Sequence, residues 1–383
     1  MYLLPKPKTI KEQDGQMLLC HSTHIVMTKE VAETEMHAAK RLQEAIRQET
    51  GLILPFSVGE VREGDLSLGI AKTLPEQTYE ITIDEKGGQI SGGDGAGVLY
   101  GVETFCQIVQ QCGGILPCVQ IQDAPDMPNR GYYFDQTRGR VLKLEELKKI
   151  ADRMCRYKLN QLQLYVEHTY LFRDFSEMWR DQTPLTAEEI LELDSYCRER
   201  HIELVPSLAS FGHLCTLLST KTYGDLCEME DSWKEPFSFW NRMRYHTINV
   251  SDERSLPLIK KMIAEYMQLF SSNKFNICAD ETFCLGKYKS KKLAEERGVH
   301  RLYIDYVKEL AQFLVENGKI PMFWGDIIWN SPELMKELPE SMICLNWGYA
   351  PEQREDETRA IAQTGAVQYP VSYTHLRAHE TGR

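Results

Sequence analysis

Two adjacent carboxylates, Asp280 and Glu281, directly follow an apolar run that reads FNICA at positions 275–279. Two neighbouring acids repel each other, so they need water or polar partners at the end of a buried strand. Carboxylates also bind sugar hydroxyls, which makes this pair a candidate for a polar ligand site. The alternative interpretation is the solvated start of a loop.

Polar and aromatic residues stand at the ends of the other predicted strands as well. Carboxylates and arginine bind hydroxyl groups, and tryptophan faces stack on pyranose rings, so this composition favours a carbohydrate site. In chain order, these strand-end residues are Asp135 and Arg138, Glu167 and His168, His213, Asp280 and Glu281, Trp324 and Asp326, and Asn346 and Trp347.

Each of these residues also has a structural interpretation. Arg138 could cap a helix or pair with Asp135, and His213 could be a satisfied core histidine. Both tryptophans could simply be core, and Glu167 with His168 could be a structural pair. The joint arrangement favours a site, because chance placement would scatter polar groups instead of repeating them at one end of successive strands.

From about residue 126 the sequence alternates short apolar strands with amphipathic helices, which is typical of an α/β fold with buried parallel strands. This order predicts a (β/α)8 TIM barrel over 126–370, incomplete because only seven strands are visible. A doubly wound sheet is the alternative, but no Gly-rich phosphate loop follows the first strand. The strands are expected at 131–137, 159–167, 202–210, 274–280, 320–326, 341–347 and 366–371.

Residues 1–125 have a different pattern. They predict a small α+β domain with a mostly antiparallel sheet, and the proline-rich segment DAPDMPNRG at 123–131 marks the boundary. Strands are expected near 15–26, 66–71, 78–84 and 88–91, and helices near 29–50 and 96–112.

The net charge of −12 argues against affinity for nucleic acid or an anionic membrane. No apolar stretch approaches the roughly 20 residues of a membrane span, and the N-terminus lacks the apolar region of a secretory signal. The eleven cysteines have no zinc-ligand spacing. We therefore expect free thiols, a cytoplasmic location and no metal site.

The ordered motifs resemble glycoside hydrolase family 20, the β-N-acetylhexosaminidases. The family has an Arg-Gly dipeptide, an Asp and a sugar-binding Arg in its first strand region, and an Asp-Glu signature after its fourth strand. The matching segments are RGYYFDQTRGR at 130–140, FGH at 211–213, NICADET at 276–282, Trp324, Trp347 and, for the last helix of the N-terminal domain, GVLYGVETFCQIVQQ at 97–111. Cys278 takes the place of a usual glycine.

This resemblance implies a retaining hydrolysis in which the 2-acetamido oxygen of the substrate attacks the anomeric carbon and gives an oxazolinium intermediate. Glu281 would be the general acid and then the base, and Asp280 would orient the acetamide. Arg138 would hold the sugar hydroxyls, Trp324 and Trp347 would wall the acetamido pocket, and His213 would support the site. Glu167 and His168 would line it. No cofactor is implied, and the partner would be a glycan with a terminal N-acetylhexosamine.

The tail VSYTHLRAHETGR at 371–383 has no apolar periodicity and resembles sequencing-adaptor read-through. We therefore expect the native part of the chain to stop near Pro370 and the eighth strand to be missing. A chain truncated there would have an incomplete pocket and be liable to inactivity. The alternative interpretation is a natural polar tail.

Two other functions compete with the exo-hexosaminidase interpretation. One is a family member that releases a disaccharide, such as a lacto-N-biosidase, and the other is a non-catalytic sugar-binding protein on the same fold. The binder is disfavoured because it has no need of both Asp280 and Glu281. A barrel acting on phosphorylated metabolites would need a late Gly-rich loop, which is not visible.

Overall fold

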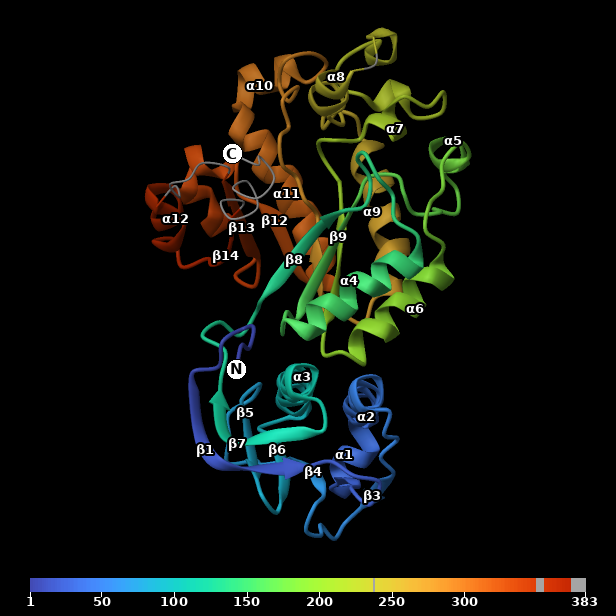
Figure 1. Ribbon diagram of the computed structural model, residues 1–383. Helices are drawn as coiled ribbons and strands as arrows, with labels where there is room; N and C mark the ends of the chain where they lie inside the picture. The colour runs from blue at the N-terminus through green and yellow to red at the C-terminus, as the bar shows by residue number, and fades with distance from the viewer. Residues whose placement is uncertain (237, 349–354, 373–383) are drawn as a thin grey trace. The chain divides into compact units, whose positions relative to one another are not determined.

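The computed structural model describes residues 1–236, 238–348 and 355–372 (Figure 1). None of the described helices is long and apolar enough to cross a membrane. The chain divides into two compact units. The first contains Met1–Tyr132, Glu145–Leu162 and Ser195–Glu203, and the second contains Tyr133–Leu144, Gln163–Asp194 and the chain from Leu204 onward.

The N-terminal part of the chain folds into a seven-stranded sheet of order β1-β7-β5-β6-β4-β2-β3. Its strands are β1 (Thr9–Leu18), β2 (Ile25–Met27), β3 (Phe56–Val58), β4 (Leu66–Ile70), β5 (Tyr79–Asp84), β6 (Gly87–Gly92) and β7 (Ile115–Asp123), and its helices are α1 (Lys29–Thr34), α2 (Met36–Thr50) and α3 (Gly95–Cys112).

The prediction of a mostly antiparallel sheet is wrong, because β2 pairs in parallel with β3 and β4, and β4 pairs in parallel with β6. The helices α1 and α2 lie between β2 and β3 in the chain, and such a crossover makes neighbouring strands parallel. Only β5, β6, β7 and β1 pair antiparallel. The predicted strand near 15–26 is two strands, the predicted helix near 29–50 is two helices, and β3 and β7 were not predicted.

The prediction of an incomplete TIM barrel is confirmed. Seven strands follow one another in chain order across a second, curled sheet (Figure 1), and the described pairs from β10 to β14 are parallel. Within the described ranges β14 and β8 do not pair, so the barrel is open there. The strands are β8 (Gly131–Asp135), β9 (Gln161–Val166), β10 (Glu203–Leu208), β11 (Lys274–Asn276), β12 (Ile320–Trp324), β13 (Ile343–Gly348) and β14 (Val367–Ser372).

Helices alternate with these strands as the periodicity predicts. Thr186 and Glu189 form the predicted capping box before α6, since each side chain accepts a hydrogen bond from the backbone N–H of the other, at 2.9 and 3.2 Å. The longer helices are α4 (Leu144–Arg156), α6 (Ala187–Arg198), α9 (Ser255–Tyr266), α10 (Lys291–Arg297), α11 (Val299–Glu316) and α12 (Glu355–Ala362).

The connection from β10 to α9 is much longer than the other connections of this sheet. Its described residues include the short elements α7 (Cys215–Leu218), η1 (Gly224–Leu226), η2 (Ser232–Lys234) and α8 (Phe239–Arg244). Because loops after barrel strands build the sites of this fold, this segment is a structural candidate for ligand contact.

Candidate active site

The acid pair follows β11 on a tightly wound backbone. β11 ends at Asn276, four residues earlier than predicted, because Cys278 (φ 58°) and Ala279 (φ 63°) adopt left-handed conformations that end the ladder. Glu281 is also left-handed, with φ 49°. Each such residue with a side chain costs about 1–2 kcal/mol. Cys278, which stands where the resemblance predicts glycine, thus has a backbone conformation that favours glycine.

Two hydrogen bonds hold this backbone. Oδ1 of Asn276 accepts from the backbone N–H of Cys278 at 2.9 Å, and the hydroxyl of Tyr303 donates to the carbonyl of Ala279 at 3.0 Å. Asn276 in turn donates to Gln163 on β9 at 3.1 Å. The strand end is therefore tied to the sheet and to α11, and the acids that follow it have a fixed direction.

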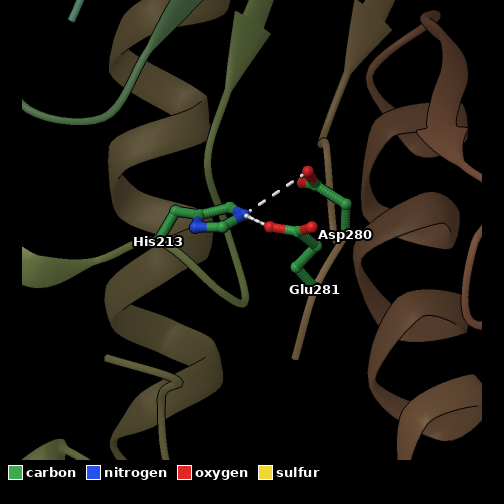
Figure 2. Close-up of side chains that lie close together, drawn as sticks. All are labelled: His213, Asp280 and Glu281. Carbon is green, nitrogen blue, oxygen red and sulfur yellow. Dashed lines mark ion pairs between the residues drawn. The ribbon is translucent and has the colours of Figure 1, made fainter. Parts of the chain in front are cut away.

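His213 points one ring nitrogen at both acids, and this Nε2 atom is 3.4 Å from a carboxylate oxygen of Asp280 and 3.4 Å from one of Glu281 (Figure 2). The preceding Gly212 has no room for a side chain, because a Cβ atom would lie 2.6 Å from the carbonyl oxygen of Asp280. The backbone of the FGH segment therefore approaches the acid pair as closely as glycine permits.

Charge follows from this geometry. Burial alone would lower the pKa of His213, but the charge of Asp280 and hydrogen bonding to both acids outweigh it and raise this pKa to about 10. Burial acts to raise the pKa of Asp280, but the His213 cation more than compensates and lowers it. At neutral pH the site thus holds a protonated His213 and an ionised Asp280.

A third carboxyl, Asp326, lies directly behind the pair. Its Oδ2 atom accepts a hydrogen bond from the backbone N–H of Glu281 at 3.0 Å. Burial and the nearby negative charge of Asp280 raise the pKa of Asp326 to about 8, so this carboxyl is mostly neutral at pH 7. Asp326 was predicted at the end of a strand, without a role in the site.

Arg138 is part of a charged network at the ends of β8 and β9. Its Nε atom lies 2.6 Å from Oδ2 of Asp135, as the structural interpretation of this residue required, and its guanidinium lies 4.7 Å from the centroid of the Tyr165 ring. Glu167 is buried and accepts hydrogen bonds from Tyr165 at 3.0 Å and from Arg242 at 2.9 Å. Arg138 still lines the cavity described below, whereas Glu167 acts as an anchor behind it.

His168 is buried beside Glu167 and is not among the residues that line the cavity. Burial lowers the pKa of His168 to about 4, so this imidazole is neutral. Glu167 and His168 are therefore placed behind the cavity wall and not on its surface.

One cavity of about 360 Å³ brings most of the predicted site residues together. Arg138, Asp280, Glu281, Trp324 and Trp347 all line it. Tyr133 packs edge-on against Trp324, with ring centroids 5.0 Å apart. The lining residues that the sequence analysis did not single out are Tyr133, Tyr165, Phe239, Trp240, Met243, Arg244 and Phe283.

Four of these additional residues come from α8 in the long β10–α9 connection. The available signal was the length of this connection, at the strand end where barrel sites form, together with the aromatic and basic sequence FWNRMR at 239–244. No periodicity could assign that sequence to a particular wall of the site.

His213, Asp280 and Glu281 also satisfy a simple distance criterion for a metal site, since their ligand atoms lie within 4.8 Å of one another. A ligating imidazole is neutral, so a metal that bound here would have to displace the proton of His213.

The chain resembles known proteins along most of its length. The family profiles "Glycosyl hydrolase family 20, domain 2" and "Glycosyl hydrolase family 20, catalytic domain" match residues 1–124 and 128–369. The chain is 24% identical over 363 residues to a protein named Beta-hexosaminidase from Porphyromonas gingivalis, covering 85% of this chain and 45% of that protein. It is 20% identical over 350 residues to a Lacto-N-biosidase from Bifidobacterium bifidum, covering 86% and 30%.

The X-ray structure of Flavobacterium johnsoniae chitobiase has the same fold, with a TM-score of 0.82 at 20% identity over 97% of this chain and 59% of that one. The chain spans about half the length, or less, of these curated relatives. The catalytic-domain profile alone covers more than half of the chain and includes the Asp280–Glu281 pair and Arg138. The chain therefore belongs to glycosyl hydrolase family 20.

Proposed function

We propose that this protein is an exo-β-N-acetylhexosaminidase that releases terminal β-linked GlcNAc or GalNAc from glycans. The observation that supports this function best is that Asp280 and Glu281 line the same cavity and that both contact the protonated His213. The family membership and the relatives named Beta-hexosaminidase point to the same activity.

The proposed mechanism divides the work between the two acids. Glu281 gives its proton to the glycosidic oxygen as the bond to the anomeric carbon breaks, and the substrate's acetamido oxygen forms a bond to that carbon. Asp280 stays ionised, accepts the acetamide N–H and stabilises the positive charge of the oxazolinium. Glu281 then takes a proton from water, whose oxygen attacks the anomeric carbon and restores the acetamide.

The other lining residues position the sugar. Arg138, held by Asp135, offers its remaining donors to the hydroxyls of the terminal sugar. Trp324 and Trp347 form the aromatic wall for the acetamido group. His213 acts through the acids, because its charge keeps Asp280 ionised while Glu281 exchanges its proton.

The experiment is release of p-nitrophenol from the β-GlcNAc aryl glycoside, measured for the wild type and for Glu281→Gln. We expect the variant to lose at least about a hundredfold in kcat, since general acid catalysis contributes about 10²–10⁴. Glu253→Gln, at an exposed acid outside the cavity, is the matched control and should retain wild-type turnover. Wild-type turnover of Glu281→Gln would contradict the proposed role.

The similarity to a Lacto-N-biosidase supports a second candidate, a family member that releases a disaccharide. Aryl glycosides of GlcNAc and of a β-linked disaccharide separate the two, because each enzyme should cleave only its own. Sugar binding without hydrolysis of either probe would instead support the non-catalytic binder.

We also propose a cytoplasmic location. All eleven cysteines are free thiols and eight of them are buried, which suits a reducing compartment. Cell fractionation of the native host, with detection by antibody, tests this location.

A further inference from the structure

The helix α8 presents unusually exposed aromatic rings to the cavity. Phe239 and Trp240 line it with 56% and 63% of their surfaces exposed, and their rings contact edge to face at 5.6 Å. Phe283, two residues after Glu281, lines the same cavity and is 41% exposed. Large apolar rings gathered at the mouth of a polar site form a contact surface for a ligand.

Arg244 lies beside these rings and has no carboxylate partner among the described residues. It is exposed, its guanidinium lies 5.2 Å from the centroid of the Trp240 ring, and no ion-pair partner exists for it within residues 1–236, 238–348 and 355–372. The other arginines here differ, since Arg138 pairs with Asp135 and Arg242 pairs with Glu167. A guanidinium has a planar fork of donors that suits a carboxylate or a sulfate.

The position of this charge matters because Asp280 and Glu281 line the same cavity and the chain carries a net charge of −12. An acidic ligand group would be repelled by that field unless a nearby cation compensated for it. Arg244 is the lining cation, among the described residues, that is free to do so.

The wall that carries Trp240 and Arg244 is also fixed in place. Nη2 of Arg242 donates to the buried carboxylate of Glu167 at 2.9 Å, and Ser238 caps the start of α8 by accepting from the N–H of Asn241 at 3.0 Å. Nη1 of Arg138 lies 3.2 Å from the sulfur of Met243. The helix that carries the rings and the guanidinium is therefore held at the cavity before a ligand arrives.

We propose that α8 forms a subsite for the sugar on the leaving side of the scissile bond, and that this subsite selects an acidic sugar. The ring of that sugar stacks on Trp240, and its carboxylate or sulfate pairs with Arg244. The proposal rests on the proposed hexosaminidase function and adds a substrate class to it.

The test compares kcat/KM on matched pairs of disaccharides with terminal β-GlcNAc. One pair carries glucuronate or glucose on the leaving side, and the other carries 6-sulfogalactose or galactose. We expect the wild type to prefer the acidic member of at least one pair by about five- to tenfold at low salt, and the preference to shrink near 0.5 M NaCl because Arg244 is exposed. The disaccharide pair that shows this preference tells whether the subsite selects a carboxylate or a sulfate.

Variants tie the preference to the residue. Arg244→Gln should reduce the ratio of acidic to neutral substrate to about one, and Arg244→Lys should retain part of it. Arg180→Gln, at an exposed arginine outside the cavity, should keep the wild-type ratio. A wild-type ratio of one, or a ratio that Arg244→Gln leaves intact, overturns the subsite while the proposed function stands. If the protein cleaves none of these five substrates, the four disaccharides and the aryl glycoside, both the subsite and the proposed function are overturned.

Discussion

The backbone N–H of Glu281 donates a hydrogen bond to Oδ2 of Asp326 across 3.0 Å. Glu281 has a left-handed backbone conformation, which a residue with a side chain keeps only when its surroundings hold it. Asp326 therefore fixes the backbone of the proposed acid, and its own carboxyl does not need to contact substrate to affect the reaction.

Two substitutions at Asp326 should separate this positioning from charge. Asp326→Asn retains an oxygen that accepts from Glu281, so we expect kcat within about tenfold of the wild type. Asp326→Ala removes the acceptor and should lower kcat by about a hundredfold, because small misplacements of a catalytic group are costly. Steady-state kinetics on the aryl glycoside measures both, and equal losses in the two variants would contradict a positioning role.

Asp326 should also make folding stability depend on pH. Its pKa is raised from 3.8 to about 8, so the folded chain binds a proton that the unfolded chain releases, and stability from this group falls as pH rises from about 4 through 8. Asp326→Asn has no such proton. Urea unfolding at pH 6 and pH 9 should show the variant gaining about 1–3 kcal/mol relative to the wild type at the higher pH. An unchanged difference would mean that the carboxyl is already ionised at pH 6.

His213 and Asp280 should be energetically coupled. His213→Gln leaves the buried Asp280 carboxylate without its cation, and we expect it to cost about 2–4 kcal/mol at pH 7. In an Asp280→Asn background the same change should cost about 1–2 kcal/mol less, because that carboxylate is no longer present. Urea unfolding of the four proteins measures the coupling, and His300→Gln, at an exposed histidine, serves as a control expected to stay within about 0.5 kcal/mol. Additive effects would show that the 3.4 Å contact contributes little.

The regular elements of the barrel could be predicted because they depend on local patterns. Apolar strands such as LQLYV at 162–166 and amphipathic helices such as α11 carry their periodicity in the sequence. The residues at the strand ends could then be predicted to share a site, because parallel strands bring their carboxyl ends to one edge of the sheet. Arg138, Asp280, Glu281, Trp324 and Trp347 were found in this way and share the cavity.

What could not be predicted depends on three-dimensional packing of irregular segments. Nothing in the sequence FWNRMR shows that Trp240 lines the same cavity as Glu281, since the path of a long connection is set by contacts such as Arg242 with Glu167. The prediction of strand directions in the N-terminal sheet failed for a related reason. The parallel pairs of β2 with β3 and β4 join strands that α1 and α2 separate in the chain, and β4 pairs in parallel with β6 because β5 lies between them in the chain but beside β7 and β6 in the sheet.

Ala279 provides a test of the strained backbone before the acid pair. The φ of 63° at Ala279 favours glycine, so Ala279→Gly removes backbone strain from the folded protein. The substitution also loses one buried methyl group, worth about 0.8 kcal/mol, and raises the conformational entropy of the unfolded chain. The gain and the two losses nearly cancel. Ala311 in α11 is equally buried but helical, so Ala311→Gly has the losses without the relief and should cost about 1–2 kcal/mol. Urea unfolding should find Ala279→Gly at least about 1 kcal/mol less destabilising than Ala311→Gly. Equal costs would show that the left-handed conformation at Ala279 carries no strain in the folded protein.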